Sequence, residues 1–159
     1  MSKIEDAPGA ATPDPKPDAF DGLLCFAVYS TGLAFNRVYK PLLDRLGLTY
    51  VQYLVILALD HRDGQAVSEL GEQLFLESNT LTPLIKRLEA AGMVTRKRDS
   101  ADERVVRVSL TDKGRAVAKD AACVPEQILE TTGMTRAQLG DMQRALVGLR
   151  ANLRGGASA

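Results

Sequence analysis

Hydrophobic residues recur at steps of three and four along much of the chain, and this spacing predicts a mainly helical protein. The first stripe runs from Phe20 to Leu42, so we expect a long amphipathic helix over residues 20–46 that ends at Gly47. The residues before it hold four of the seven prolines and predict a disordered tail, rich in proline and aspartate, over residues 1–19.

A second helix is expected to be short and buried. Thr49 and Gln52 are spaced as a capping box, which marks the start of a helix. The residues that follow, Tyr53–Leu59, are apolar nearly all round, and such a helix has no face suited to water. His61–Gly64 is expected to form the turn after it.

The pattern then predicts two short helices joined by a tight turn. The first covers about 67–73, and the second begins at Ser78, a favourable N-cap residue, and stops before Gly92. Pro83 lies early in the second helix, where it is expected to kink or loosen the first turns.

A half-buried hairpin is predicted next. Met93–Arg98 and Arg104–Leu110 have strand character, and the polar loop Asp99–Glu103 joins them. Two short helices followed by a basic hairpin make a winged helix-turn-helix. We therefore place the winged-helix part at residues 49–110.

The remaining chain is predicted to be helical. Thr111 caps a helix that runs to about Glu130, and Thr135-x-x-Gln138 caps a last one that ends near Leu153.

The long terminal helices, 20–46 and 111–153, carry more apolar surface than a small winged domain can cover. We expect them to form a homodimer interface. The predicted fold class is thus mainly α, with a single domain over residues 20–153 and a flexible tail at 154–159.

The composition is that of a globular protein: 45% of the 159 residues are hydrophobic and 25% are charged. No signal-like segment opens the chain, and the longest apolar run, Leu54–Leu59, is far shorter than the ~20 residues of a membrane span. We expect a cytoplasmic protein with no membrane partner. Two cysteines, Cys25 and Cys123, cannot build a disulfide framework, so a bond between them would be regulatory or catalytic.

The formal net charge is zero, but the charges are unevenly distributed. Residues 84–107 carry seven bases against four acids, whereas residues 1–21 carry five acids against two bases. A basic patch on a neutral protein fits a nucleic-acid site confined to one face. An ordinary solvated surface is the alternative.

Small polar side chains at the start of the second short helix can approach base edges and phosphates. Arg104, beside the hairpin tip, can enter a narrow A·T-rich minor groove, and Asp102 can hold its guanidinium in position. The candidate DNA-binding residues are Ser78, Asn79, Thr80, Thr82, Lys86, Arg87, Arg96, Asp102, Arg104 and Arg107. A winged helix that makes only protein contacts, with Lys86 and Arg87 in solvent, remains the alternative.

These features resemble the MarR family of bacterial transcriptional regulators over roughly residues 20–153. The matching positions are Leu70-x₃-Leu74, Thr80, Leu84, Leu88-Glu89-x-x-Gly92-x-Val94-x-Arg96, Asp102-x-Arg104, Val108-x-Leu110-Thr111 and Gly114. The resemblance implies a homodimer that binds palindromic double-stranded operator DNA, usually as a repressor. It also implies major-groove roles for Thr80, Thr82, Lys86 and Arg87 and a minor-groove role for Arg104.

Cys25 has an unusual setting for a helical cysteine. Seven of the eight aromatic residues fall between Phe20 and Tyr53. Tyr29 shares the face of Cys25, but Tyr39 lies about 21 Å further along a straight helix and can reach only the Cys25 of a second, antiparallel chain. Tyrosine donors and the helix N-terminus both favour a thiolate, which attacks peroxides and becomes a sulfenic acid.

Two segments resemble the organic-hydroperoxide-sensing (OhrR) branch of the family. They are Leu24-Cys25-Phe26-Ala27 and Leu81-Thr82-Pro83-Leu84-x-Lys86-Arg87-Leu88-Glu89. The resemblance implies that Cys25 is the peroxidatic cysteine, that Tyr39 and Tyr50 donate to it with Tyr29 as a further candidate, and that an organic hydroperoxide is the inducer. It further implies that Cys123 is the resolving cysteine of a disulfide between subunits. On the residues alone, a buried structural Cys123 is equally compatible.

Two other functions stay open. The same aromatic residues suit a MarR-type repressor that a small phenolic or aromatic ligand releases, with Cys25 incidental. A thiol peroxidase enzyme is the second alternative, against which stand the lack of a C-x-x-C motif and of alternating strands and helices. No cofactor or metal site is expected, because His61 is the only histidine and no acidic or cysteine cluster has ligand spacing.

Overall fold

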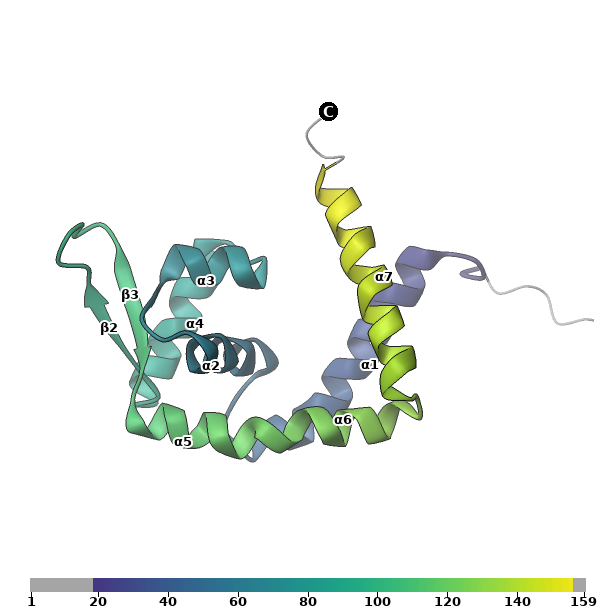
Figure 1. Ribbon diagram of the computed structural model, residues 1–159, viewed down its shortest axis with the longest axis horizontal. Coiled ribbons are helices and arrows are strands. Elements are labelled where there is room, and N and C mark those ends of the chain that lie inside the picture. The colour runs from purple at the N-terminus through teal and green to yellow at the C-terminus, as the bar shows by residue number, and fades with distance from the viewer. Residues whose placement is uncertain (1–18, 156–159) are drawn as a thin grey trace, which may run out of the picture. The chain divides into compact units, whose positions relative to one another are not determined.

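The computed structural model describes residues 19–155. The tail predicted at 1–19 therefore lies outside the described residues except for Ala19, and so do residues 156–159. The described chain is mainly helical and carries one small antiparallel sheet (Figure 1), as the sequence predicts. It divides into two compact units, one that ends at Ala34 and one that begins at Phe35.

The first unit holds a short turn and the start of helix α1 (Leu24–Asp44). The prediction that this helix starts at residue 20 is wrong, because Gly22 has a φ of +79°, a left-handed conformation that a helix does not accommodate. The rings of Phe20 and Phe26 stack with centroids 4.5 Å apart. Large apolar side chains of this unit are exposed, namely Phe20, Leu23, Leu24, Phe26, Val28, Tyr29 and Leu33. The amphipathic stripe of the sequence is thus an apolar surface of the single chain.

The capping box predicted before the second helix is present. The Thr49 N–H donates to Gln52 Oε1 at 2.8 Å, and the Gln52 N–H donates to Thr49 Oγ1 at 3.4 Å. Helix α2 (Tyr50–His61) starts directly after this cap and is longer at both ends than the predicted 53–59. Its buried side chains are Tyr53, Val55, Ile56, Ala58 and Leu59.

The two short helices of the helix-turn-helix are α3 (Val67–Leu74) and α4 (Ser78–Ala90). The prediction that Ser78 caps α4 is wrong by one residue: Ser78 is already helical, and Glu77 occupies the N-cap position without a side-chain cap bond. Phe75 ends α3 with a φ of +58°, which turns the chain between the two helices. Pro83 lies inside α4, whose span continues on both sides of it.

The hairpin consists of β2 (Val94–Arg98) and β3 (Val106–Leu110), close to the predicted strands. A third strand, β1 (Gln65–Ala66), was not predicted; it pairs with β3 and gives the antiparallel order β1-β3-β2. In this register Val94 is opposite Leu110, and Lys97 is opposite Arg107. The central strand β3 therefore connects the wing to the segment that leads into α3.

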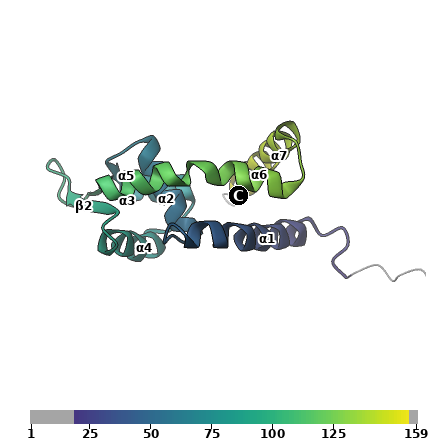
Figure 2. The ribbon, with the colours of Figure 1, turned by 90° about the horizontal axis from the view of Figure 1, so that it is seen from below.

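Thr111 caps the next helix as predicted, through its Oγ1 and the Gly114 N–H at 3.0 Å. The predicted continuous helix to Glu130 is wrong. It is interrupted, because α5 (Asp112–Asp120) gives way to a 3₁₀ turn, η1 (Ala121–Cys123), before α6 (Val124–Thr132). Pro125 has no N–H to donate to the preceding turn, which accounts for the break. Figure 2 shows α5 and α6 following one another nearly in line.

Helix α7 (Arg136–Gly155) is the last described element. The predicted box is present at its start, where the Thr135 N–H donates to Gln138 Oε1 at 2.9 Å and the Gln138 N–H to Thr135 Oγ1 at 3.3 Å. Arg154 and Gly155 belong to this helix, which corrects the start of the predicted tail. Its Met142, Leu146, Val147 and Leu153 side chains are exposed.

The core of the second unit forms around α2. The α2 side chains pack with those of α3, α4, α5 and β3, and the largest fully buried residues include Leu59, Leu70, Leu81, Ile85 and Val108. This arrangement fixes α4 and the hairpin on one scaffold. Among the described residues, no helix is both long enough and apolar enough to cross a membrane.

Gly114 offers a test of how tightly α5 joins this scaffold. A Cβ at this position would lie 2.1 Å from the Met93 carbonyl oxygen and 3.0 Å from Leu110 Cδ2. We expect Gly114→Ala to lower the free energy of unfolding by about 1–3 kcal/mol, since the backbone must shift. Gly148→Ala is the control, because nothing lies within 4 Å of its Cβ position and alanine favours a helix. Urea unfolding of both variants measures the difference; equal stabilities would contradict the close approach.

Candidate nucleic-acid interface and cysteine site

The exposed face of α4 carries most of the predicted DNA-binding residues. Leu81, Ile85 and Leu88 point into the core at helical spacing, which turns the intervening positions outward. Ser78, Asn79, Thr80, Lys86 and Arg87 are exposed, and Thr82 is half-buried. The Thr80 hydroxyl donates to Asn79 Oδ1 at 3.3 Å. The start of α4 thus presents hydroxyl and amide groups, and two cations follow on the second half of the helix.

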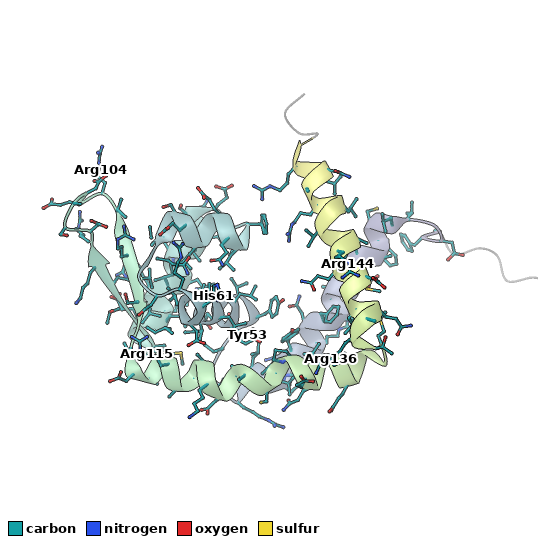
Figure 3. All side chains as sticks on the ribbon, viewed as in Figure 1. Tyr53, His61, Arg104, Arg115, Arg136 and Arg144 are labelled. Carbon is teal, nitrogen blue, oxygen red and sulfur yellow. The ribbon has the colours of Figure 1, made fainter. Side chains whose placement is uncertain are left out.

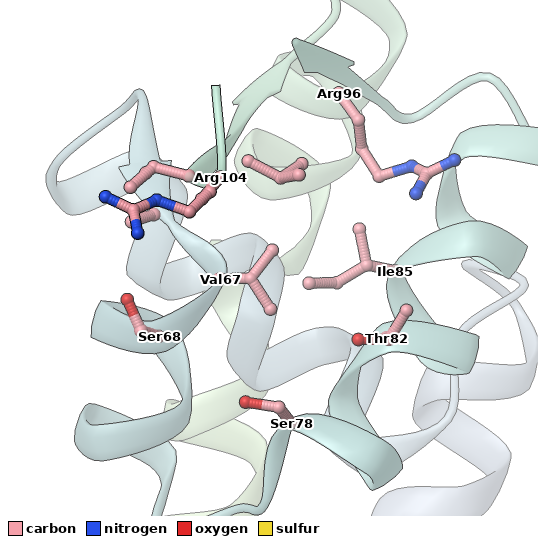
Figure 4. Close-up of a pocket in the computed structure, with 10 residues that line it drawn as sticks. Val67, Ser68, Ser78, Thr82, Ile85, Arg96 and Arg104 are labelled. Atoms are coloured by element: carbon pink, nitrogen blue, oxygen red, sulfur yellow. The ribbon is translucent and has the colours of Figure 1, made fainter. Parts of the chain in front are cut away.

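A groove of about 260 Å³ separates α4 from the wing. Ser78 and Thr82 of α4, Val67 and Ser68 of α3, and Arg96 and Arg104 of the hairpin line it (Figure 4). Four of the residues singled out from the sequence are therefore brought together here. The helices contribute hydroxyl groups and the apolar side chains of Val67 and Ile85 to the groove, and the hairpin contributes two guanidinium groups and two valines.

Arg104 projects from the wing tip, where its side chain is 92% exposed (Figure 3). Asp102 Oδ1 accepts both the Arg104 backbone N–H at 3.0 Å and the Arg104 Nε–H at 3.2 Å. The contact that the sequence predicted between these residues is present. It fixes the base of a side chain whose end is free to reach outward.

Two other predicted DNA contacts are engaged inside the protein. Arg96 donates to Glu89 Oε2 of α4 at 2.7 Å and is only partly exposed. Arg107 donates to Asp99 Oδ2 and to the Gly64 carbonyl at 3.1 Å, and it lies 3.8 Å from Glu69 Oε2. A DNA contact for either residue stays a prediction.

These ion pairs shift the protonation equilibria of the groups around Arg107. The Ala101 N–H, followed by Arg107, lowers the pKa of Asp99. The Ala66 N–H, followed by Arg62, lowers the pKa of Glu69, and Asp99 raises the pKa of Arg107. All three groups are therefore charged at neutral pH.

Three tyrosines form a cluster in the second unit. The ring of Tyr39 lies 4.7 Å from that of Tyr50 and 6.0 Å from that of Tyr53, centroid to centroid. Burial, with smaller contributions from Tyr50 and Tyr53, raises the pKa of Tyr39 to about 12. Burial likewise raises the pKa of Tyr50 and of Tyr53. The phenols remain protonated at neutral pH and keep O–H groups to donate.

Tyr53 was not singled out from the sequence. It is 2% exposed and lies on α2 (Figure 3). The signal that was available is its spacing from Tyr50, since residues three apart are neighbours on a helix surface. Beside Tyr39 and Tyr50 lies a pocket of about 220 Å³, which Leu43, Leu48 and the Lys40–Asp44 ion pair also line.

Cys123 is the second cysteine of the chain. After burial and Tyr50, its charge is the smallest contribution to the raised pKa of Tyr53. The thiol is exposed on η1, receives a contact from Gln127 Nε2 at 3.6 Å and donates to the Asp120 carbonyl at 3.5 Å. This corrects both the expected place on a regular fifth helix and the alternative of a buried residue.

Cys25 belongs to the first unit and is exposed in the first turn of α1. The N–H groups of this turn point toward the helix start and favour an anion there. Tyr29 follows one turn later with its side chain 62% exposed, and its ring lies 6.4 Å from that of Phe26. In residues 19–155 no group of three or more His, Cys, Asp or Glu residues is arranged to hold a metal ion.

Comparisons with known proteins agree with this geometry. Residues 37–121 match the family model described as transcriptional regulator SarA/Rot. The chain is 49% identical to the HTH-type transcriptional regulator TtmR of Methylorubrum extorquens over 87% of this chain and 69% of that protein. It is 42% identical to the organic hydroperoxide resistance transcriptional regulator of Bacillus subtilis over 77% of this chain and 84% of that protein.

Solved structures of AbfR, a relative known from Staphylococcus epidermidis, share the fold. Reduced AbfR bound to DNA matches with a TM-score of 0.70 and 34% identity over 83% of this chain and 90% of that one. Overoxidised AbfR bound to DNA matches with a TM-score of 0.65 over 80% and 90%. The chain therefore belongs to the MarR/SarA family of winged-helix transcriptional regulators.

Proposed function

We propose that this regulator is a homodimeric repressor that leaves its operator when an organic hydroperoxide oxidises Cys25. The observation that supports this most directly is the cluster of protonated phenols formed by Tyr39, Tyr50 and Tyr53. A Cys25 that approaches this cluster from a partner subunit meets hydrogen-bond donors for its thiolate. The names of the Bacillus relative and of the AbfR structures point to the same chemistry.

The first step forms an S–O bond at Cys25. The thiolate attacks the outer oxygen of the hydroperoxide, the O–O bond breaks, and its electron pair leaves on the alkoxide. The alkoxide takes a proton and becomes an alcohol, so the peroxide is reduced while the sulfur becomes a sulfenic acid. Phenol donors such as Tyr39 and Tyr50 stabilise the thiolate before attack and the alkoxide as it leaves.

The second step consumes the sulfenic acid. The Cys123 sulfur attacks the oxidised sulfur of Cys25 in the partner subunit, an S–S bond forms, and the S–O bond breaks. The departing hydroxide takes a proton and leaves as water. Because Cys123 is exposed on a 3₁₀ turn, its thiol is accessible to an oxidised cysteine of another subunit.

DNA binding in this proposal uses α4 and the wing tip. Two α4 helices of a dimer read the half-sites of a palindrome, while Arg104 enters an A·T-rich minor groove. Movement of the dimer helices on oxidation changes the half-site spacing, which DNA geometry fixes. Release of the operator follows from this mismatch.

A second candidate function is release by a small phenolic or aromatic ligand. The pocket beside Tyr39 and Tyr50 is the observation in its favour. At about 220 Å³ it is smaller than the ~300–1,000 Å³ typical of small-molecule sites. The oxidation mechanism needs no such volume, and we therefore favour it.

The first prediction from this proposed function concerns Arg104. We expect Arg104→Ala to weaken binding to a duplex that the wild-type protein selects from a random-sequence library, by about 1–3 kcal/mol. Lys86→Ala and Arg87→Ala should instead flatten the dependence of affinity on salt, because phosphate contacts are lost. Arg144→Ala on α7 is the control, since its side chain is 75% exposed and does not line the groove. Fluorescence anisotropy measures all four; wild-type affinity of Arg104→Ala at every salt concentration would refute the assignment.

The second prediction concerns Cys25. We expect Cys25→Ser to bind the selected duplex normally and to stay bound after cumene hydroperoxide is added, whereas wild type dissociates. Tyr39→Phe and Tyr50→Phe should slow dissociation without abolishing it, because each removes one donor. Tyr29→Phe tests whether the tyrosine of the same helix turn contributes. Stopped-flow anisotropy follows the release, and a Cys25→Ser protein that still dissociates would favour the ligand-release alternative.

The third prediction concerns Cys123. Peroxide-treated wild type should run as a covalent dimer on a non-reducing gel and return to the monomer position with a reductant. Cys123→Ser should remain monomeric and accumulate sulfinic or sulfonic acid at Cys25, detected by mass spectrometry. An intrachain bond, or no bond at all, would show that Cys123 does not resolve the sulfenic acid of the partner.

A further inference from the structure

Arg107 connects three segments of the winged helix through one guanidinium group. It stands on the central strand β3, opposite Lys97 on one side and Ala66 on the other. Its donors reach Asp99 at the start of the wing loop and the Gly64 carbonyl before β1, and Glu69 of α3 lies 3.8 Å away. The wing loop is thereby attached to the first helix of the helix-turn-helix.

Each acidic partner of Arg107 is itself held in place. The Glu69 carboxylate accepts the Ala66 N–H at 2.7 Å and pairs with Arg62 at 3.1 Å. Asp99 Oδ1 accepts the Ala101 N–H at 2.8 Å, and the Asp99 side chain is only 15% exposed. Arg107 therefore binds two carboxylates whose positions are set by the backbone.

The same contacts continue from Asp99 to Arg104. The Asp99 N–H donates to the Val105 carbonyl, and the Val105 N–H donates to the Asp102 carbonyl, both at 2.9 Å. Asp102 then holds Arg104 through its Oδ1. A displacement of Asp99 must change the loop conformation that aims Arg104.

We propose that Arg107 is a positioning residue for DNA binding, which sets the direction of Arg104 by tying Asp99 to Glu69 instead of contacting DNA itself. The proposal rests on the minor-groove role of Arg104 stated above. Two carboxylates face the Arg107 guanidinium, so a DNA phosphate would have to displace bonds that are already made. A lysine at this position cannot replace the arginine, because an ammonium group lacks the planar set of donors.

A double-mutant cycle between Arg104 and Arg107 tests the proposal. We expect Arg104→Ala and Arg107→Gln each to weaken binding of the selected duplex about tenfold or more. The double variant should bind within about twofold of Arg104→Ala, because Arg107 acts only through Arg104. Additive losses would overturn the proposal. Normal binding by Arg104→Ala would instead refute the proposed minor-groove role of Arg104, and with it a positioning role for Arg107. Failure of the Arg107 proposal alone is thus distinguishable from failure of the Arg104 assignment.

Salt dependence separates positioning from a phosphate contact. Arg107→Gln should keep the wild-type slope of log affinity against log salt, whereas each lost phosphate contact lowers the slope by about 0.9. Arg107→Lys should bind as weakly as Arg107→Gln. Wild-type affinity of Arg107→Lys, or a reduced slope for Arg107→Gln, would identify a direct phosphate contact and contradict the inference.

Two further variants control for the loss of charge and for a folding defect of Arg107→Gln. Lys97→Gln removes the same charge from the position opposite Arg107 and should change affinity less than twofold; a loss equal to that of Arg107→Gln would mean that charge alone matters. Asp99→Asn keeps an oxygen for the Ala101 N–H but weakens the pairing with Arg107, and it should reproduce the Arg107→Gln loss. If Arg107→Gln fails to unfold cooperatively on heating, Asp99→Asn carries the cycle with Arg104→Ala in its place.

Discussion

The burial of the central residues of α2 is the constraint on which the winged helix depends. Val55, Ile56 and Leu59 have no exposed surface, and the helix is covered by α3, α4, α5 and β3. Each of these elements has only one apolar face to bury, and α2 is the common partner. The position of α4 relative to the wing is therefore set by buried side chains of the core. Hydrophobic burial holds the elements together, and polar contacts at the surface of this core orient the exposed side chains.

The parts of the fold that follow from local interactions could be predicted from the sequence. Thr49 with Gln52, Thr111 with Gly114 and Thr135 with Gln138 all form within one helix turn, and each marks a helix start correctly. The hairpin was predictable because its alternation continues over a whole strand. The strand β1 was not, since a pair of residues shows no alternation and its pairing with β3 spans forty positions of chain. The break at η1 was not predicted, because the hydrophobic spacing continues through Pro125 and does not show where one helix ends and the next begins.

The candidate site divides in the same way. Asp102 and Arg104 are two residues apart, so their contact could be inferred from spacing alone. The partners of Arg96 and Arg107 come from other elements, and a count of basic residues cannot distinguish a cation held by carboxylates from one that faces solvent. The contact of Tyr39 on α1 with Tyr53 on α2 joins two helices and required the packed structure. The type of each side chain could therefore be read from the sequence. Whether that side chain is free to bind DNA depends on its partners in the tertiary structure.

The lack of a side chain at Gly114 has a mechanical consequence. Backbone atoms of α5 and of the segment that enters β2 meet at a distance at which no Cβ fits, and the Thr111 hydroxyl reaches the carbonyls of Gly92 and Met93 at the same place. Such a junction leaves the first turn of α5 no room to move independently of the segment that enters β2. We therefore expect a displacement of this turn to be passed directly to the hairpin.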